Sequence, residues 1–310
     1  MWRFPMDSTT GISLAFPSYD QLLTDYDAER RALWCYFDAH PRPTFNLDLL
    51  ADIHDVQRRL CAQLHTPVVT DPDAGPIQYI IQASATPGVF NLGGDLELFA
   101  QLIEHRDRAG LLDYGQRCVD AVYQNAIHYG VPGVTTIALV QGLALGGGFE
   151  SALSSNVLIA ERSARFGFPE ILFNLFPGMG ALNLLARRVE LHQAERLVAS
   201  GENYSAEQLH ELGIVDIVVE DGEGMHAVRD YIQRHRRARN GLLGIRHARE
   251  RLQPIEREEL LDICDIWVDT ALRISARDLR TMQRVAAAQL RRVAQAPATT
   301  AATSVHASTG

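Results

Sequence analysis

The sequence contains no lysine, and all 29 of its basic residues are arginine. Schiff-base chemistry through a lysine amine is therefore excluded. A bound phosphate group would have to be held by arginine, by backbone amides or by a helix N-terminus. The chain also lacks any run of 18 apolar residues, so we expect no membrane-spanning segment and no membrane partner.

Cysteine is scarce, with four widely separated residues and no CxxC pair, which argues against a zinc site. The eleven histidines form neither HExxH nor HxxxH beside carboxylates, so we expect no metal. No GxSxG is present, which excludes the nucleophile elbow of a serine hydrolase. Scattered thiols and an N-terminus without an apolar signal-peptide core predict a cytoplasmic protein.

Composition indicates one large domain, or one domain with an appendage, because 46% of the 310 residues are hydrophobic. A net charge of −9 argues against nucleic acid as a partner. Residues 226–294 depart from this average, with 15 arginines against 9 acidic residues, a charge of about +6. This stretch is either a set of solvated helix faces or a basic rim for an acidic or phosphorylated partner.

Alternating strand and helix patterns predict an α/β fold with a mostly parallel sheet. The pattern at 21–40 fits either a helix or a strand. Asp95 is expected to cap one helix, and Ser205 with Gln208 resembles a capping box. Expected strands lie at 76–84, 135–140, 157–160 and 214–219, and expected helices at 46–65, 95–104, 108–129, 149–153, 181–200, 205–212, 225–250, 255–274 and 276–294. We expect residues 66–75 to form a loop and the Ala/Thr/Ser-rich tail from 295 to be disordered.

Two glutamates, Glu150 and Glu170, stand in glycine-marked turns, GGGFE and FGFPE. Glycine lets the backbone approach a ligand closely, and a carboxyl in apolar surroundings has a raised pKa, as a general acid requires. Each glutamate alone has a plainer explanation: Glu150 could complement a helix dipole, and Glu170 could cap a helix. The pair predicts acid/base chemistry on one reacting carbon.

A third glycine turn, FNLGGDL at 90–96, precedes both glutamates. The glycine turns at 93–94 and 146–148 could each supply one backbone N–H to a single carbonyl oxygen. A lone Gly-Gly is usually a plain turn, but the three motifs in this order indicate chemistry beside a thioester carbonyl.

These motifs resemble the crotonase (enoyl-CoA hydratase/isomerase) superfamily over roughly residues 75–220. FNLGGDLELFAQLI, LGGGFESALS, YSAEQLHELGIVD and IWVDTALRISARDLRTMQR further resemble the diffusible-signal-factor synthases (RpfF-type enzymes), from about residue 80 to 293. The resemblance implies a crotonase-like α/β spiral of ββα units with a C-terminal helical region. It also implies that Glu150 and Glu170 are the acid/base pair and that Gly94 and Gly147 donate the oxyanion-hole amides.

The synthase resemblance implies a specific reaction. Such enzymes dehydrate a 3-hydroxyacyl thioester on acyl carrier protein to a cis-2-enoyl thioester. They then hydrolyse it to a free cis-2-unsaturated fatty acid, a quorum-sensing signal. No cofactor is implied beyond the phosphopantetheine of the carrier protein or coenzyme A. The expected partners are acyl carrier protein, a sensor-kinase receiver domain that would inhibit the enzyme, and further copies of the chain in a trimer.

A long acyl chain requires an apolar pocket. The candidate residues are Leu145, Phe173, Met179, Trp267 and Val285, and each could instead be ordinary core. We expect a crotonase-like core over 1–220, a helical region over 221–294 and the tail over 295–310. Residues 1–75 show no clear crotonase pattern. An ordinary enoyl-CoA hydratase or isomerase and a non-catalytic interaction module remain alternatives.

Overall fold

The computed structural model describes residues 16–64 and 75–295, and in these ranges ten strands form two sheets. The strands are β1 (Leu22–Asp27), β2 (Ala32–Phe37), β3 (Tyr79–Ser84), β4 (Val89–Asn91), β5 (Thr135–Val140), β6 (Leu143–Leu145), β7 (Val157–Glu161), β8 (Arg165–Gly167), β9 (Asn203–Ser205) and β10 (Ile217–Val219). The α-helices are α1 (Leu47–Leu64), α2 (Leu96–Glu104), α3 (Arg108–Ala126), α4 (Gly147–Leu153), α5 (Ala181–Leu185), α6 (Leu191–Ser200), α7 (Ala206–Glu211), α8 (Gly224–His235), α9 (Arg239–Leu252), α10 (Arg257–Ala271) and α11 (Ala276–Gln295). Short 3₁₀ helices are η1 (His128–Gly130), η2 (Pro169–Phe173) and η3 (Arg236–Ala238).

The chain alternates between the two sheets. The larger has the order β1-β2-β3-β5-β7-β10 and the smaller the order β4-β6-β8-β9. β3, β5 and β7 are each followed directly by a strand of the smaller sheet, so each turn of the chain adds one strand to each sheet. Inner strands pair in parallel, whereas β1 and β9 pair antiparallel at the edges. The result is a spiral of ββα units.

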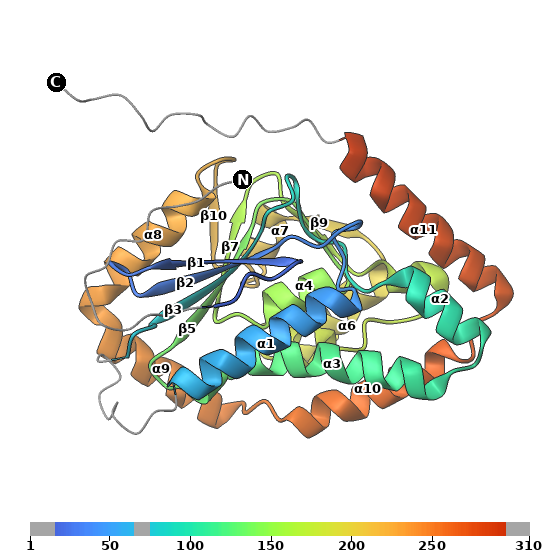
Figure 1. Ribbon diagram of the computed structural model, residues 1–310, viewed down its shortest axis with the longest axis horizontal. Helices are drawn as coiled ribbons and strands as arrows, with labels where there is room; N and C mark the ends of the chain where they lie inside the picture. The colour runs from blue at the N-terminus through green and yellow to red at the C-terminus, as the bar shows by residue number, and fades with distance from the viewer. Residues whose placement is uncertain (1–15, 65–74, 296–310) are drawn as a thin grey trace.

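Helices cover both faces of the larger sheet (Figure 1). On one side, α3 packs against α1 and α10, and the three run side by side in the picture. On the other side, Val228 and Ile232 of α8 join a buried cluster with Leu139 of β5. Because both faces are covered, all six residues of β5 are buried, so its last four residues, 137–140, are apolar without alternation.

Several sequence-based expectations are confirmed, among them the helix at 46–65, which forms as α1. Segment 21–40, for which the pattern left helix and strand open, forms strands β1 and β2. The side chain of Asp95 accepts from the Glu97 and Leu98 amides as the α2 cap. The capping box of Ser205 and Gln208 is present at α7.

Two long helices expected from sequence are broken instead. Segment 181–200 divides into α5 and α6, and Arg188 between them donates to the carbonyls of Ser155 and Ile214. Segment 225–250 divides at η3, where the C-terminal part of the chain leaves the sheet and α9 begins. Periodicity alone did not show either break, because both halves remain amphipathic.

The smaller sheet was missed, since each of its four strands has only three residues, too few for a strand pattern to show in the sequence. The expected disordered tail and most of the expected loop at 66–75 lie outside the described residues. Among the helices that the structure describes, none is both long and apolar enough to cross a membrane.

Candidate active site

The loop after β4 is held by backbone contacts that only glycine permits. Gly93 has φ +97°, and its amide donates to Oδ1 of the buried Asn91 at 2.8 Å. A β-carbon on Gly148 would lie 2.2 Å from the Asn91 carbonyl oxygen. The loop and the start of α4 therefore pack backbone to backbone.

This packing brings Gly94 and Gly147 together. A β-carbon on Gly147 would lie 3.6 Å from the amide nitrogen of Gly94. Gly94 also forms a parallel bridge with Phe45. Within residues 16–64 and 75–295, neither glycine amide donates to a backbone acceptor. Both amides are thus available for one ligand oxygen, which is the arrangement that an oxyanion hole requires.

Glu150 lies in the first turns of α4 and is 2% exposed. Its Oε1 accepts from the amides of Met179 and Ala181, at 2.9 and 3.0 Å. Burial raises the pKa of Glu150 to about 7, and the two hydrogen bonds from backbone amides oppose this rise by stabilising the carboxylate. Glu150 is therefore poised to exchange a proton near neutrality.

Glu170 stands in η2 with its carboxyl against the Gly146 turn, where a β-carbon on Gly146 would lie 2.3 Å from Oε1. The residue is partly exposed, but its Oε2 has no solvent access and no hydrogen-bond partner among the residues that the structure describes. Burial, and then the charge of Glu150, raise the pKa of Glu170 to about 8. The two carboxyls titrate as a coupled pair, with the proton favoured on Glu170.

One cavity contains both glutamates and both glycines. It has a volume of about 820 Å³, part of it open to solvent, which is within the range of small-molecule sites. Phe173, Met179 and Trp267, proposed from sequence as pocket residues, lie in its wall. Trp267 comes from α10, is 1% exposed and meets the Phe99 ring edge-on at 5.1 Å. The C-terminal helices thus help to enclose the cavity.

Two candidate pocket residues do not line this cavity, which corrects the sequence-based expectation. Leu145 packs with Val89 and Leu92 in a separate cluster behind the glycine turn. Val285 is half-buried against the main core, whereas Gln289, one turn further along α11, reaches the cavity. Successive side chains point to opposite faces of a strand, so nearness to the glycine turn did not set the direction of Leu145. Val285 and Gln289 share one face of α11, so they differ in their position along the helix.

Sequence reasoning missed the aromatic wall from α2 and α3. The Tyr114 hydroxyl donates to the Phe45 carbonyl at 2.6 Å and accepts from the Asp95 amide at 3.3 Å. A β-carbon on Gly94 would meet the Phe99 ring at 2.7 Å. These two rings therefore position the Gly94 loop. Their only signal was the amphipathic pattern of the two helices, which also fits ordinary core.

Two sheets joined by ββα turns, with two glutamates facing two glycine amides, define the crotonase class of fold. The model of the family "Enoyl-CoA hydratase/isomerase" matches residues 68–252, more than half of the chain. The chain belongs to this family. Enzymes of the family carry the acyl substrate on coenzyme A and need no cofactor.

Curated relatives match parts of the chain. A probable enoyl-CoA hydratase of Bacillus subtilis is 31% identical over 151 residues, which are 49% of this chain and 55% of that protein. A short-chain-enoyl-CoA hydratase of Clostridium acetobutylicum is 39% identical over 94 residues, 30% of this chain and 36% of that protein. Across the first relatives matched, the chain spans between 14% and 55% of their length.

Solved structures confirm the crotonase-like fold. Enoyl-CoA hydratase from Bacillus halodurans has a TM-score of 0.69 at 18% identity, covering 86% of this chain and 100% of that one. Pseudomonas aeruginosa DspI has a TM-score of 0.61 at 21% identity, covering 92% of this chain and 100% of that one.

Proposed function

We propose that the protein is a diffusible-signal-factor synthase, which dehydrates a 3-hydroxyacyl thioester and then hydrolyses it to a free cis-2-unsaturated fatty acid. The observation that carries the proposal is one apolar cavity holding two glutamates of raised pKa beside two available glycine amides. The cavity wall formed by α10 and α11 lies in the segment whose sequence resembles these synthases.

In the dehydration step, the Gly94 and Gly147 amides bind the thioester oxygen and stabilise the enolate that develops. Glu150 removes a proton from C2, because its two amide hydrogen bonds favour the carboxylate. Glu170 donates its proton to the C3 hydroxyl, which leaves as water as the C2–C3 double bond forms. One shared proton on the coupled pair near neutral pH supplies one base and one acid.

In the hydrolysis step, a carboxylate of the pair activates water for attack on the thioester carbon. The same amides stabilise the tetrahedral oxyanion, the C–S bond breaks, and the thiol leaves with a proton. Because both steps place negative charge on the same oxygen, one oxyanion hole serves both reactions.

The proposed carrier is acyl carrier protein. α11 supplies Gln289 to the cavity wall, and Arg280 and Arg284 on the same helix are exposed, so an acidic carrier that docked on α11 would meet basic side chains. A homotrimer and inhibition by a receiver domain belong to the same proposal. Light scattering and a pull-down with isolated receiver domains test these two parts; a monomer and no captured domain would remove them.

The test uses purified protein with a chain-length series of 3-hydroxyacyl carrier proteins, and mass spectrometry of the products. We expect free cis-2-enoic acids from the wild type and none from Glu150→Ala or Glu170→Ala. An ordinary enoyl-CoA hydratase, favoured by the names of the curated relatives, would release no free acid but would hydrate crotonyl-CoA. If both variants kept both activities, this result would contradict any catalytic role for the site.

A further inference from the structure

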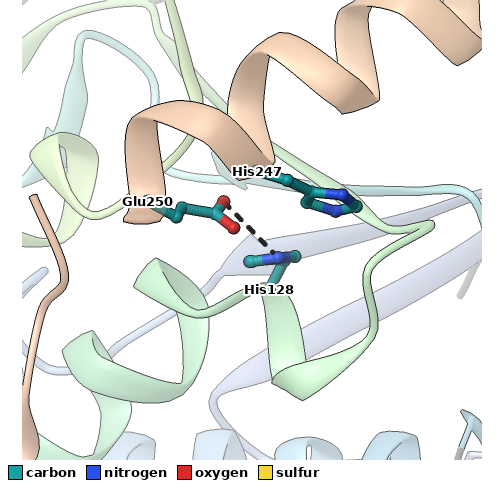
Figure 2. A group of neighbouring side chains, drawn as sticks. All are labelled: His128, His247 and Glu250. Atoms are coloured by element: carbon teal, nitrogen blue, oxygen red, sulfur yellow. Dashed lines mark ion pairs between the residues drawn. The ribbon is translucent and has the colours of Figure 1, made fainter. Parts of the chain in front are cut away.

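Three side chains with metal-binding atoms meet away from the active-site cavity, where η1 follows α3 and touches α9. They are His128 of η1 with His247 and Glu250 of α9 (Figure 2). One ligand atom from each lies within 4.8 Å of the other two. His247 and Glu250 are three residues apart, so they share one face of α9. The cluster joins the C-terminal helical region to the core.

Two polar atoms of the cluster, Nδ1 of His128 and Oε1 of Glu250, have no hydrogen-bond partner within residues 16–64 and 75–295. Nε2 of His128 lies 3.6 Å from Oε1 of Glu250, which is too long for a hydrogen bond. Oε1 of Glu250 is buried and has no hydrogen-bond partner in the described part of the chain. A buried carboxylate oxygen without a partner is costly, and a cation between these two atoms would remove that cost.

The histidines are prepared to act as ligands. His128 is 7% exposed, and its Nδ1 has no solvent access and no hydrogen-bond partner in the described part of the chain. No hydrogen bond to that nitrogen therefore fixes the imidazole in another role. Nε2 of His247 lies 3.3 Å from the Pro132 carbonyl oxygen, the kind of outer contact that orients a ligating imidazole through its other nitrogen.

Arg246 is the positive charge nearest to the cluster, with Nε 3.5 Å from Oε1 of Glu250. One terminal nitrogen of its guanidinium donates to Oγ1 of Thr135 and Oδ1 of Asn156, whereas Nε forms only this ion pair among the described residues. The charge of Arg246 lowers the affinity for a cation, but it forms no hydrogen bond that occupies the Glu250 oxygen.

We propose that His128, His247 and Glu250 bind a zinc ion that fastens α9 to the end of α3. Two imidazole nitrogens and one carboxylate oxygen, without thiolate, are a known zinc donor set that leaves a fourth position for water. A hollow of about 640 Å³, lined by Gly130 and Pro132 with the three ligands, gives the ion a route from solvent. The proposal departs from the expectation of no metal, which rested on local spacing, because the two histidines lie far apart in sequence.

The test is calorimetric titration of the full, tag-free and metal-stripped protein with zinc chloride, and thermal unfolding with and without zinc. His247→Ala and Glu250→Gln alter exposed or half-exposed side chains and leave the buried His128 in place. The control is His226→Ala on α8. It removes an exposed histidine whose Nε2 lies 3.4 Å from a carboxylate oxygen of Asp230, a histidine–carboxylate pair that lies outside the proposed site and has no second histidine beside it among the described residues.

We expect one zinc ion per chain and a higher melting temperature with zinc. His247→Ala and Glu250→Gln should each weaken binding about tenfold or more, since loss of even an outer partner costs 10–100-fold. His226→Ala should bind as the wild type does. No zinc binding by the wild type, or equal binding by the wild type and both ligand variants, would overturn the proposal.

Discussion

Replacing Gly146 with alanine would place a methyl group against the carboxyl of Glu170. The β-carbon would lie 2.3 Å from Oε1, about 1 Å closer than an ordinary contact of 3.4 Å. Gly146 also has φ +50° and ψ −123°, a conformation that L-residues rarely adopt. The substitution therefore displaces the carboxyl of the proposed general acid and strains the turn at the same time.

The two effects have different magnitudes and different readouts. A displacement of about 1 Å at a catalytic group costs roughly 10²-fold in rate, which is about 2.7 kcal/mol of activation free energy. The strained backbone costs about 1–3 kcal/mol of unfolding free energy. We therefore expect kcat/KM for the proposed dehydration to fall about 100-fold in a folded but less stable enzyme.

The assay compares kcat/KM and thermal unfolding for Gly146→Ala, Gly213→Ala and the wild type. Gly213 also has positive φ, at +76°, but a β-carbon there meets no atom within 4 Å. Gly213→Ala should lose stability and retain its rate, which separates strain from displacement. A folded Gly146→Ala enzyme with kcat/KM within about threefold of the wild type would refute the reasoning.

Further predictions concern the glutamates and the cavity wall. In a pH–rate profile, activity should rise through about pH 7, as Glu150 ionises, and fall above about pH 8, as Glu170 loses its proton. Glu150→Gln should remove the rising limb and lower the rate about 10²–10⁴-fold. Because the pKa of Glu170 is higher in the folded state, the folded protein binds more protons than the unfolded chain between about pH 4.5 and pH 8. The contribution of Glu170 to the free energy of unfolding therefore falls as pH rises through this range. Glu170→Gln should consequently melt at a higher temperature than the wild type at alkaline pH and gain less at pH 5, by calorimetry. Trp267→Ala should cost about 3–5 kcal/mol of unfolding free energy and shift the preferred chain length upward, measured with the substrate series. An unchanged preference would remove Trp267 from the acyl pocket.

Much of this protein was accessible from local sequence chemistry. β-branched runs such as 135–140 and the Asp95 cap predict their elements because the interactions that form them lie within a few residues. The glycine motifs around Glu150 and Glu170 predicted the candidate acid/base pair for a similar reason. Where two backbone segments pack closely, only glycine fits, and such glycines can be recognised in the sequence.

The tertiary structure decided what depends on distant residues. Whether Leu145 or Gln289 reaches the cavity was set by strand alternation and by how α11 packs. The breaks at Arg188 and at η3 follow from the contacts of these segments with other parts of the fold. The raised pKa values of the two glutamates come from burial by helices remote in sequence, and His128 met His247 only through folding. Residue type and local spacing thus determined the chemistry that is present, whereas long-range packing determined which groups face one another and with what charge.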